Sequence, residues 1–285
     1  MIMDKIKVKV NAKINLSLDV LGLYNGGYHE LDMVMASIGI YDVVKCEKSN
    51  KITVKMNGKL SNEHNTAYKV CKLCYETYGV GLMNVSISKR IPFSAGLGGS
   101  SADASAVLFC IGRLYGLTYE QLYPIACKVG SDVVFMMNGG IMRAKGKGDD
   151  LLRLPFHDYY LVVAKGKHGT RTKDVFDEYD KSPEKTNYTE SYVNAKNNLE
   201  RYSSIKNALY NASKKCNGEI EETYNILKKY SDIVCMSGSG ASCFAVFDSI
   251  EKANDVANSI RCENYANLSY VKACRVQNFA IKEIT

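Results

Sequence analysis

The sequence predicts an α+β protein of two lobes. Segments typical of strands and of helices follow one another without a regular strand–helix–strand repeat, which argues against a doubly wound parallel sheet. The chain has 285 residues, enough to bury a large core and to divide into two units. We expect an N-terminal unit at 1–158 and a C-terminal unit at 159–285. A hydrophobic content of 46% and a charged content of 24% are ordinary for a globular protein.

The N-terminal unit opens with two strand patterns. Residues 5–10 alternate lysine with isoleucine or valine, which predicts a strand at a sheet edge. Residues 12–20 alternate more strictly, so Ile14 faces the core while Lys13 and Asn15 share the other face, where a lysine is most often solvated. Elsewhere in this unit the patterns predict strands at 33–47, 52–56, 84–90 and 140–145, helices at 65–78, 101–115 and 119–129, and a hairpin-like return through 151–165.

The C-terminal unit also mixes the two kinds of element. Its apolar periodicities predict helices at 172–179, 190–213, 217–230 and 250–260, and strands at 233–237, 242–248 and 268–276. The first two of these strands are separated by a glycine- and serine-rich turn that contains Gly238 and Gly240. Backbone N–H groups in such a turn suit an anionic ligand, although a tight hairpin explains the same residues without a function.

Composition favours a cytoplasmic protein. The N-terminus lacks the apolar region of a signal peptide, and no apolar run approaches the roughly 18 residues of a membrane span. Ten cysteines without a secretory signal then favour free thiols in a reducing compartment. Cys71 and Cys74 have metal or redox spacing, but they fall in a helical pattern with no second pair nearby, so we expect buried packing thiols.

The net charge of +7 does not by itself identify a partner. The basic residues are mostly scattered, and no helical basic face carries interleaved aromatic residues, so we expect no nucleic acid to be bound. We expect no membrane partner either. A polyanionic small substrate is compatible with the charge.

The most informative segment is the glycine- and serine-rich stretch 92–106, which leads directly into an apolar helix pattern. Glycines let the backbone approach a ligand closely, and the free N–H groups of a helix N-terminus attract anions, so the segment predicts a phosphate site. It contains no lysine and is therefore not a P-loop of the Walker type. The alternative explanation, a flexible surface turn without a ligand, is disfavoured because a compact serine-rich capping sequence directly precedes the apolar helix pattern. The expected binding residues are Pro92, Ser94, Ala95, Gly96, Leu97, Gly98, Gly99, Ser100 and Ser101.

Several other candidates have two explanations each. Asp132 precedes a short apolar run, where an aspartate serves equally well as a helix N-cap or as a catalytic carboxylate. Tyr28 and His29 follow the turn sequence Asn25-Gly26-Gly27 and are exposed loop residues unless they meet a ligand. Phe176 lies in an amphipathic helix pattern and is explained about equally well as a core residue.

Four motifs resemble one family. The segment Pro92–Ala106 is similar to the ATP-phosphate loop of the GHMP kinase superfamily. Four further segments resemble motifs of one family of this superfamily, the 4-diphosphocytidyl-2-C-methyl-D-erythritol kinases. In the order in which the family has them, they are Ala12–Leu16, Gly27–Leu31, Gly130–Val133 and Met236–Ala241. The matches span nearly the whole chain. One departure is Ser100, which stands where the family usually has a third consecutive glycine.

The resemblance implies a two-lobed GHMP kinase fold, with an N-terminal lobe like ribosomal protein S5 and a ferredoxin-like C-terminal lobe. It implies ATP as co-substrate, Mg²⁺ with the nucleotide, and phosphorylation of the 2-hydroxyl of a substrate carrying a cytidine diphosphate. No dedicated metal cage of carboxylates is visible. The resemblance gives the general base to Asp132, a neighbouring catalytic role to Lys13, and substrate binding to Asn15, Tyr28, His29, Thr172, Phe176, Gly238 and Gly240.

Two alternatives stay open at this point. Another GHMP small-molecule kinase, acting on homoserine, mevalonate or a sugar, would share the phosphate loop but would have no cytosine for Tyr28, His29 and Phe176 to bind. A catalytically silent nucleotide-binding homologue would lose the lysine–aspartate pair, and both Lys13 and Asp132 are present. We expect a monomer or a weak homodimer.

Overall fold

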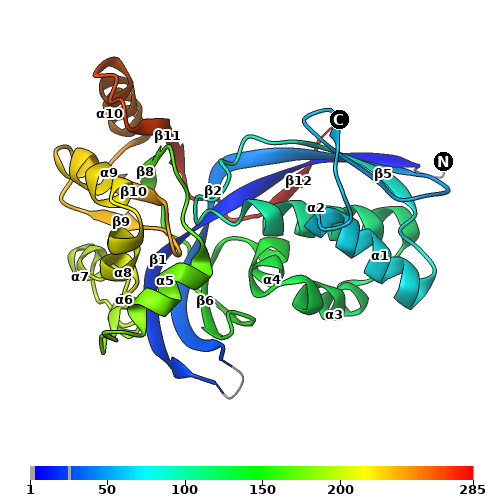
Figure 1. Cartoon of the computed structure of the whole chain (residues 1–285), viewed down its shortest axis with the longest axis horizontal. Helices are drawn as coiled ribbons and strands as arrows, with labels where there is room; N and C mark the ends of the chain where they lie inside the picture. The colour runs from blue at the N-terminus through cyan, green and yellow to red at the C-terminus, as the bar shows by residue number, and fades with distance from the viewer. Residues whose placement is uncertain (1–3, 25–26, 285) are drawn as a thin grey trace.

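The computed structural model describes residues 4–24 and 27–284 and arranges them around two sheets (Figure 1). The first sheet is built on two long antiparallel strands, β1 (Lys5–Leu23) and β2 (His29–Lys48). Its order is β12-β1-β2-β5-β3-β4, and β6 and β7 join it through β2. These further strands are β3 (Thr53–Met56), β4 (Lys59–Leu60), β5 (Met83–Ser88), β6 (Ile141–Gly146), β7 (Asp150–Arg153) and β12 (Ile281–Glu283).

Four helices gather against one face of this sheet (Figure 1). They are α1 (Thr66–Tyr78), α2 (Gly99–Tyr115), α3 (Tyr119–Val129) and α4 (Ser131–Asn138). Helix α2 packs on β1 and β2 and also contacts the other three helices. Its small buried residues Ala102, Ala104 and Ala106 allow this close approach, which brings the start of α2 next to β1.

The second sheet is antiparallel and has the order β11-β8-β10-β9. Together with α9 (Glu219–Lys228) and α10 (Ile250–Cys262), its strands follow the chain order strand–helix–strand–strand–helix–strand of a ferredoxin-like unit. The α+β prediction is therefore confirmed. The strands are β8 (Tyr160–Gly166), β9 (Val234–Met236), β10 (Ser242–Phe247) and β11 (Leu268–Arg275), and α5 (Thr172–Tyr179) follows β8.

The single helix expected at 190–213 is wrong. The structure has three short helices there: α6 (Tyr188–Val193), α7 (Asn198–Ser203) and α8 (Tyr210–Cys216). Asn194 ends the first, and the side chain of Asn197 caps the second by accepting from the Glu200 N–H. Before α8 the backbone of residues 206–208 bonds to Leu18 of β1 instead of continuing a helix.

The edge position expected for residues 5–10 is also wrong. Val8–Val10 pair with Glu283–Ile281 of β12, so β1 has a neighbour on both sides in this part of the sheet. The predicted strands 5–10 and 12–20 form one continuous strand, with register shifts against β2. Asn25 and Gly26 of the expected turn lie outside the described residues.

The cysteine prediction is confirmed. Cys71 and Cys74 are free, fully buried thiols on α1. Within residues 4–24 and 27–284, no helix is both long enough and apolar enough to cross a membrane.

Candidate active site

A cleft of about 600 Å³ lies where β1, the glycine loop of residues 92–99 and the start of α2 meet the second lobe. This volume is in the range of small-molecule and cofactor sites. Most of the candidate residues line it: Lys13, Asn15, Pro92, Ser94, Ala95, Gly96, Leu97, Gly98, Gly99, Ser100, Ser101, Asp132, Thr172, Phe176 and Gly238. Tyr28, His29 and Gly240 are not among its lining residues.

The polar face of β1 is buried, contrary to the usual expectation for a strand lysine. Lys13, Asn15, Ser17 and Asp19 are each at most 5% exposed. The second lobe covers this face: the Ser17 hydroxyl lies 2.9 Å from the Thr189 hydroxyl, and Asp19 accepts from the Thr189 N–H. A buried polar row of this kind is stable only when its members have partners, and these contacts supply them.

Lys13 is the centre of the candidate catalytic group. Its ammonium donates to the Asn15 side-chain oxygen at 2.7 Å and lies 3.7 Å from the Asp132 carboxylate. Asn15 in turn donates to the Met33 sulfur, which fixes the orientation of its amide. The arrangement joins a buried cation to a carboxylate that is 32% exposed and therefore accessible from the cleft.

Asp132 does not cap its helix. The N-cap of α4 is Gly130, no side-chain capping bond is present, and Asp132 lies in the first helical turn. There its negative charge is favoured by the helix dipole, but its side chain is left available to the cleft. The N-cap explanation of this residue is therefore wrong.

The two glycine-rich segments hold each other in place. The Ser237 hydroxyl donates to the Gly96 carbonyl at 2.9 Å, and the Ser242 N–H donates to the Ala95 carbonyl at 3.1 Å. Gly96 has φ +70°, and a Cβ at this position would lie 2.1 Å from the Ser237 carbonyl oxygen. Only glycine permits this approach, so the turn at 237–240 forms one wall of the candidate phosphate site.

The remaining glycine positions differ in what they face. Gly238 lies beside the Lys13 side chain: a Cβ added to Gly238 would be 3.4 Å from the Lys13 ammonium nitrogen. A Cβ added to Gly240 would instead point at the side chains of Ile220 and Met236, so Gly240 contributes to the shape of the turn from the side away from Lys13. Thr172, at the start of α5, bonds to the Ser239 hydroxyl at 3.0 Å and so ties α5 to the same turn.

Two of the three aromatic candidates, His29 and Phe176, form a stack that the sequence did not predict. The rings of His29 and Phe176 are stacked with their centroids 4.3 Å apart, and His29 Nε2 lies 2.8 Å from Asp180. Tyr28 is 64% exposed, and the Lys147 ammonium lies over its ring. Phe176 thus reaches the cleft with His29 behind it, while Tyr28 stands apart from both.

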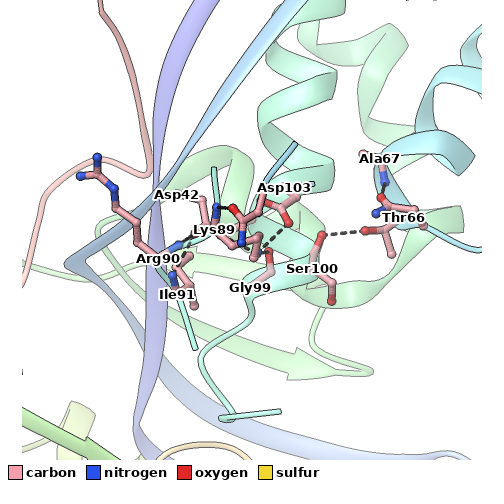
Figure 2. A network of polar contacts seen from close by, with 12 residues as sticks. Asp42, Thr66, Ala67, Lys89, Arg90, Ile91, Gly99, Ser100 and Asp103 are labelled. Carbon is pink, nitrogen blue, oxygen red and sulfur yellow. Dashed lines mark hydrogen bonds and ion pairs between the residues drawn. The ribbon is translucent and has the colours of Figure 1, made fainter. Parts of the chain in front are cut away.

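A buried lysine at the entry to the glycine loop was missed by the sequence reasoning (Figure 2). Lys89 lies three residues before Pro92, and its ammonium contacts Asp42 at 2.5 Å and Asp103 at 2.7 Å. Burial raises the pKa of Asp103 to about 7, with the charge of Asp42 adding to the rise and Lys89 opposing it. An aspartate among the alanines of a helix whose buried face is otherwise made of small and apolar residues was the signal in the sequence.

The described residues contain no group of three or more His, Cys, Asp or Glu side chains arranged to hold a metal ion. Mg²⁺ commonly binds through one or two protein oxygens together with the phosphates of its nucleotide. The hydroxyl- and carboxylate-bearing cleft fits a metal that arrives with a nucleotide, and the described residues offer no pre-formed cage.

Family models match both lobes. The model described as the GHMP kinases N terminal domain matches residues 65–142, and the one described as GHMP kinases C terminal matches residues 193–267. A protein of Clostridium botulinum (strain Alaska E43 / Type E3) named 4-diphosphocytidyl-2-C-methyl-D-erythritol kinase is 38% identical over 92% of this chain and 97% of its own length. A protein of the same name from Thermoanaerobacter pseudethanolicus is 37% identical over 88% of this chain and 90% of its own.

Solved structures agree with this similarity. A crystal structure of 4-(cytidine 5'-diphospho)-2C-methyl-D-erythritol kinase superposes with a TM-score of 0.80 at 27% identity, covering 95% of this chain and 98% of that one. A homoserine kinase from Cytophaga hutchinsonii superposes with a TM-score of 0.77 at 20% identity, covering 100% and 98%. The second likeness shows the shared fold alone.

Proposed function

The chain belongs to the 4-diphosphocytidyl-2-C-methyl-D-erythritol kinase family of GHMP kinases, and from this membership we propose how its residues carry out the reaction. The activity is ATP-dependent phosphorylation of a small-molecule alcohol in isoprenoid precursor synthesis. The acceptor we propose is the 2-hydroxyl of 4-diphosphocytidyl-2-C-methyl-D-erythritol. The observation that carries the mechanism is the contact between Lys13 and Asp132 beside the glycine loop.

Asp132 is the proposed general base. Its carboxylate would accept the proton of the substrate hydroxyl as the oxygen attacks the γ-phosphorus of ATP in line, and the bond from the γ-phosphorus to the bridging oxygen would break to release ADP. Lys13, 3.7 Å away, would supply a positive charge that stabilises the negative charge developing on the transferring phosphoryl group. The hydrogen bond to Asn15 holds the lysine in this position, and Gly238 leaves room for its ammonium.

The glycine loop is the proposed ATP-phosphate site. Its Ser94–Ser101 backbone N–H groups and the N-terminus of α2 suit the β- and γ-phosphates. Mg²⁺ accompanying the nucleotide would neutralise charge between the phosphates, and we propose that the Ser101 hydroxyl lies near it. Oligomeric state stays a prediction: monomer or weak homodimer.

Replacing Gly98 by alanine is expected to weaken ATP binding about tenfold or more. Gly98 has φ +69°, which alanine adopts only with strain, and an added Cβ would lie 2.5 Å from the Met136 methyl and 3.1 Å from the Lys13 side chain, so these side chains must move as well. Calorimetric titration with ATP measures the change. Gly116→Ala is the matched control, because Gly116 ends the same helix with φ +77° and has nothing within 4 Å of its Cβ position. Equal ATP affinity in the two variants would contradict the assignment of the loop.

Phe176 and His29 are the proposed cytosine contacts, and the exposed Tyr28 is proposed as a further contact to the substrate. Phe176→Ala and His29→Ala are expected to raise the KM for the cytidine substrate roughly tenfold, because base stacking contributes about 1–3 kcal/mol per aromatic contact. The KM for ATP should change little. Since the two rings stack on each other, the double variant should lose less than the sum of the single losses.

The control for this series is Tyr75→Ala, which removes a half-exposed aromatic on α1 outside the cleft. A rise in the KM for ATP equal to that for the cytidine compound would overturn the base-binding assignment. That result would not affect the assignments of the phosphate loop and of the Lys13–Asp132 pair.

A further inference from the structure

We propose that Asp42, Lys89 and Asp103 are positioning residues that hold the glycine loop in its ATP-binding conformation. This inference rests on the proposed function and extends it to three side chains that touch neither reacting atom. The three come from β2, from the segment after β5 and from α2, and they meet beside the two ends of the loop (Figure 2).

The contacts of these residues tie down both ends of the loop. At its entry, one Asp42 oxygen accepts from the backbone N–H groups of Arg90 and Ile91, at 2.5 and 2.9 Å. At its exit, the Lys89 ammonium donates to the Gly99 carbonyl at 3.3 Å and to Asp103 of α2 at 2.7 Å. The second Asp42 oxygen accepts from the same ammonium and joins the two ends. Residues 92–98 therefore connect two anchored positions, the backbone of Arg90 and Ile91 on one side and that of Gly99 on the other.

Burial makes this linkage strong and dependent on each member. The side chains of Lys89, Asp42 and Asp103 are 4%, 0% and 6% exposed. Removing one partner from a buried ion group leaves the others without compensation, which is far more costly than removing an exposed pair. Two carboxylates share one ammonium, and the second oxygen of Asp103 has no hydrogen-bond partner.

The loop needs such support because its conformation is unfavourable by itself. Ser94, a residue with a Cβ, has φ +47°, a region of backbone conformation that such residues adopt only at a cost in free energy. A loop released at both ends would populate other conformations, and the apparent Kd for ATP would rise in proportion to the lost fraction of competent molecules. Saturating ATP would restore the competent conformation. The effect should therefore appear in the Kd and KM for ATP and leave kcat nearly unchanged.

The test compares Asp103→Ala with Asp103→Asn. Alanine removes the acceptor for Lys89, and we expect the Kd for ATP to rise about tenfold or more. Asparagine keeps a side-chain oxygen that accepts from Lys89, and it should restore the Kd to within about threefold of wild type. ATP binding is measured by calorimetry without the alcohol substrate, so the result stands even if the proposed acceptor proves wrong.

Asp32→Ala is the matched control, because Asp32 is a buried aspartate of the same strand β2 and pairs with Arg143 away from the loop. It should lower the melting temperature without changing the Kd for ATP more than about twofold. Lys89→Gln serves as an independent variant, because it removes the ammonium that donates to Asp42, to Asp103 and to the Gly99 carbonyl. A folded Asp103→Ala or Lys89→Gln protein with wild-type ATP affinity would overturn the proposal, as would a loss equal to that of Asp32→Ala.

Discussion

Asp132→Asn is expected to lower kcat by about 10²–10⁴-fold, the usual contribution of a positioned general base. Asparagine keeps the size of the side chain and loses the proton acceptor. Because Gly130 rather than Asp132 occupies the N-cap of α4, and Asp132 makes no capping bond, the substitution removes little from the helix. Steady-state kinetics with both substrates saturating measures the loss.

The same variant should keep its melting temperature and its ATP affinity close to those of wild type. Asp174→Asn is a useful control, since Asp174 lies in the first turn of α5 as Asp132 lies in that of α4, and it is not among the cleft residues. An Asp132→Asn enzyme with near-normal kcat would remove the base from the mechanism. Catalysis would then rest on positioning and on the charge of Lys13.

Lys13→Met is the second substitution with a large expected effect. Methionine fills much of the lysine volume against Gly98 but removes the ammonium that contacts Asn15 and Asp132. Loss of one fixed group that stabilises developing charge typically costs about 10²–10³-fold in kcat. We expect a loss of that order, measured as ADP release at saturating concentrations of both substrates.

Lys7→Met provides the control, because Lys7 lies on the same strand but is exposed. Its kcat should stay within about twofold of wild type, because surface substitutions away from special features usually change the free energy of unfolding by only roughly 0.5 kcal/mol or less and Lys7 is not among the cleft residues. If Lys13→Met retained most of its kcat while the protein bound ATP normally, the lysine would be a structural residue of the buried polar face of β1.

The elements with strong local signals were predictable from the sequence. Helix α5 was expected at 172–179, the range the structure gives, because a clear amphipathic pattern spans it. The segment 190–213 failed because Asn194 and Asn197 stop the helix and because residues 206–208 bond to β1. That competition is decided by a strand almost two hundred residues earlier in the chain, which no local pattern reports.

The candidate site also contains residues that local motifs predict and residues that only the folded chain brings together. The glycine loop and Asp132 belong to local motifs, and the structure brings them together with Lys13 in one cleft. The network of Asp42, Lys89 and Asp103 depends on three elements separated in sequence, so local pattern analysis missed it. The His29–Phe176 stack joins the two lobes across 147 positions and was likewise invisible, and the roles of these residues remain proposals.

The measurement that tests the account most directly is ADP release by the wild-type protein with one alcohol substrate at a time. We predict turnover with 4-diphosphocytidyl-2-C-methyl-D-erythritol, and kcat/KM values for homoserine and mevalonate lower by at least about 10²-fold, since neither offers a base to stack on Phe176 or a diphosphate for the glycine turns. Phosphorus NMR of the product should show the new phosphate on the 2-hydroxyl. Equal or better turnover of homoserine or mevalonate would contradict the proposed acceptor.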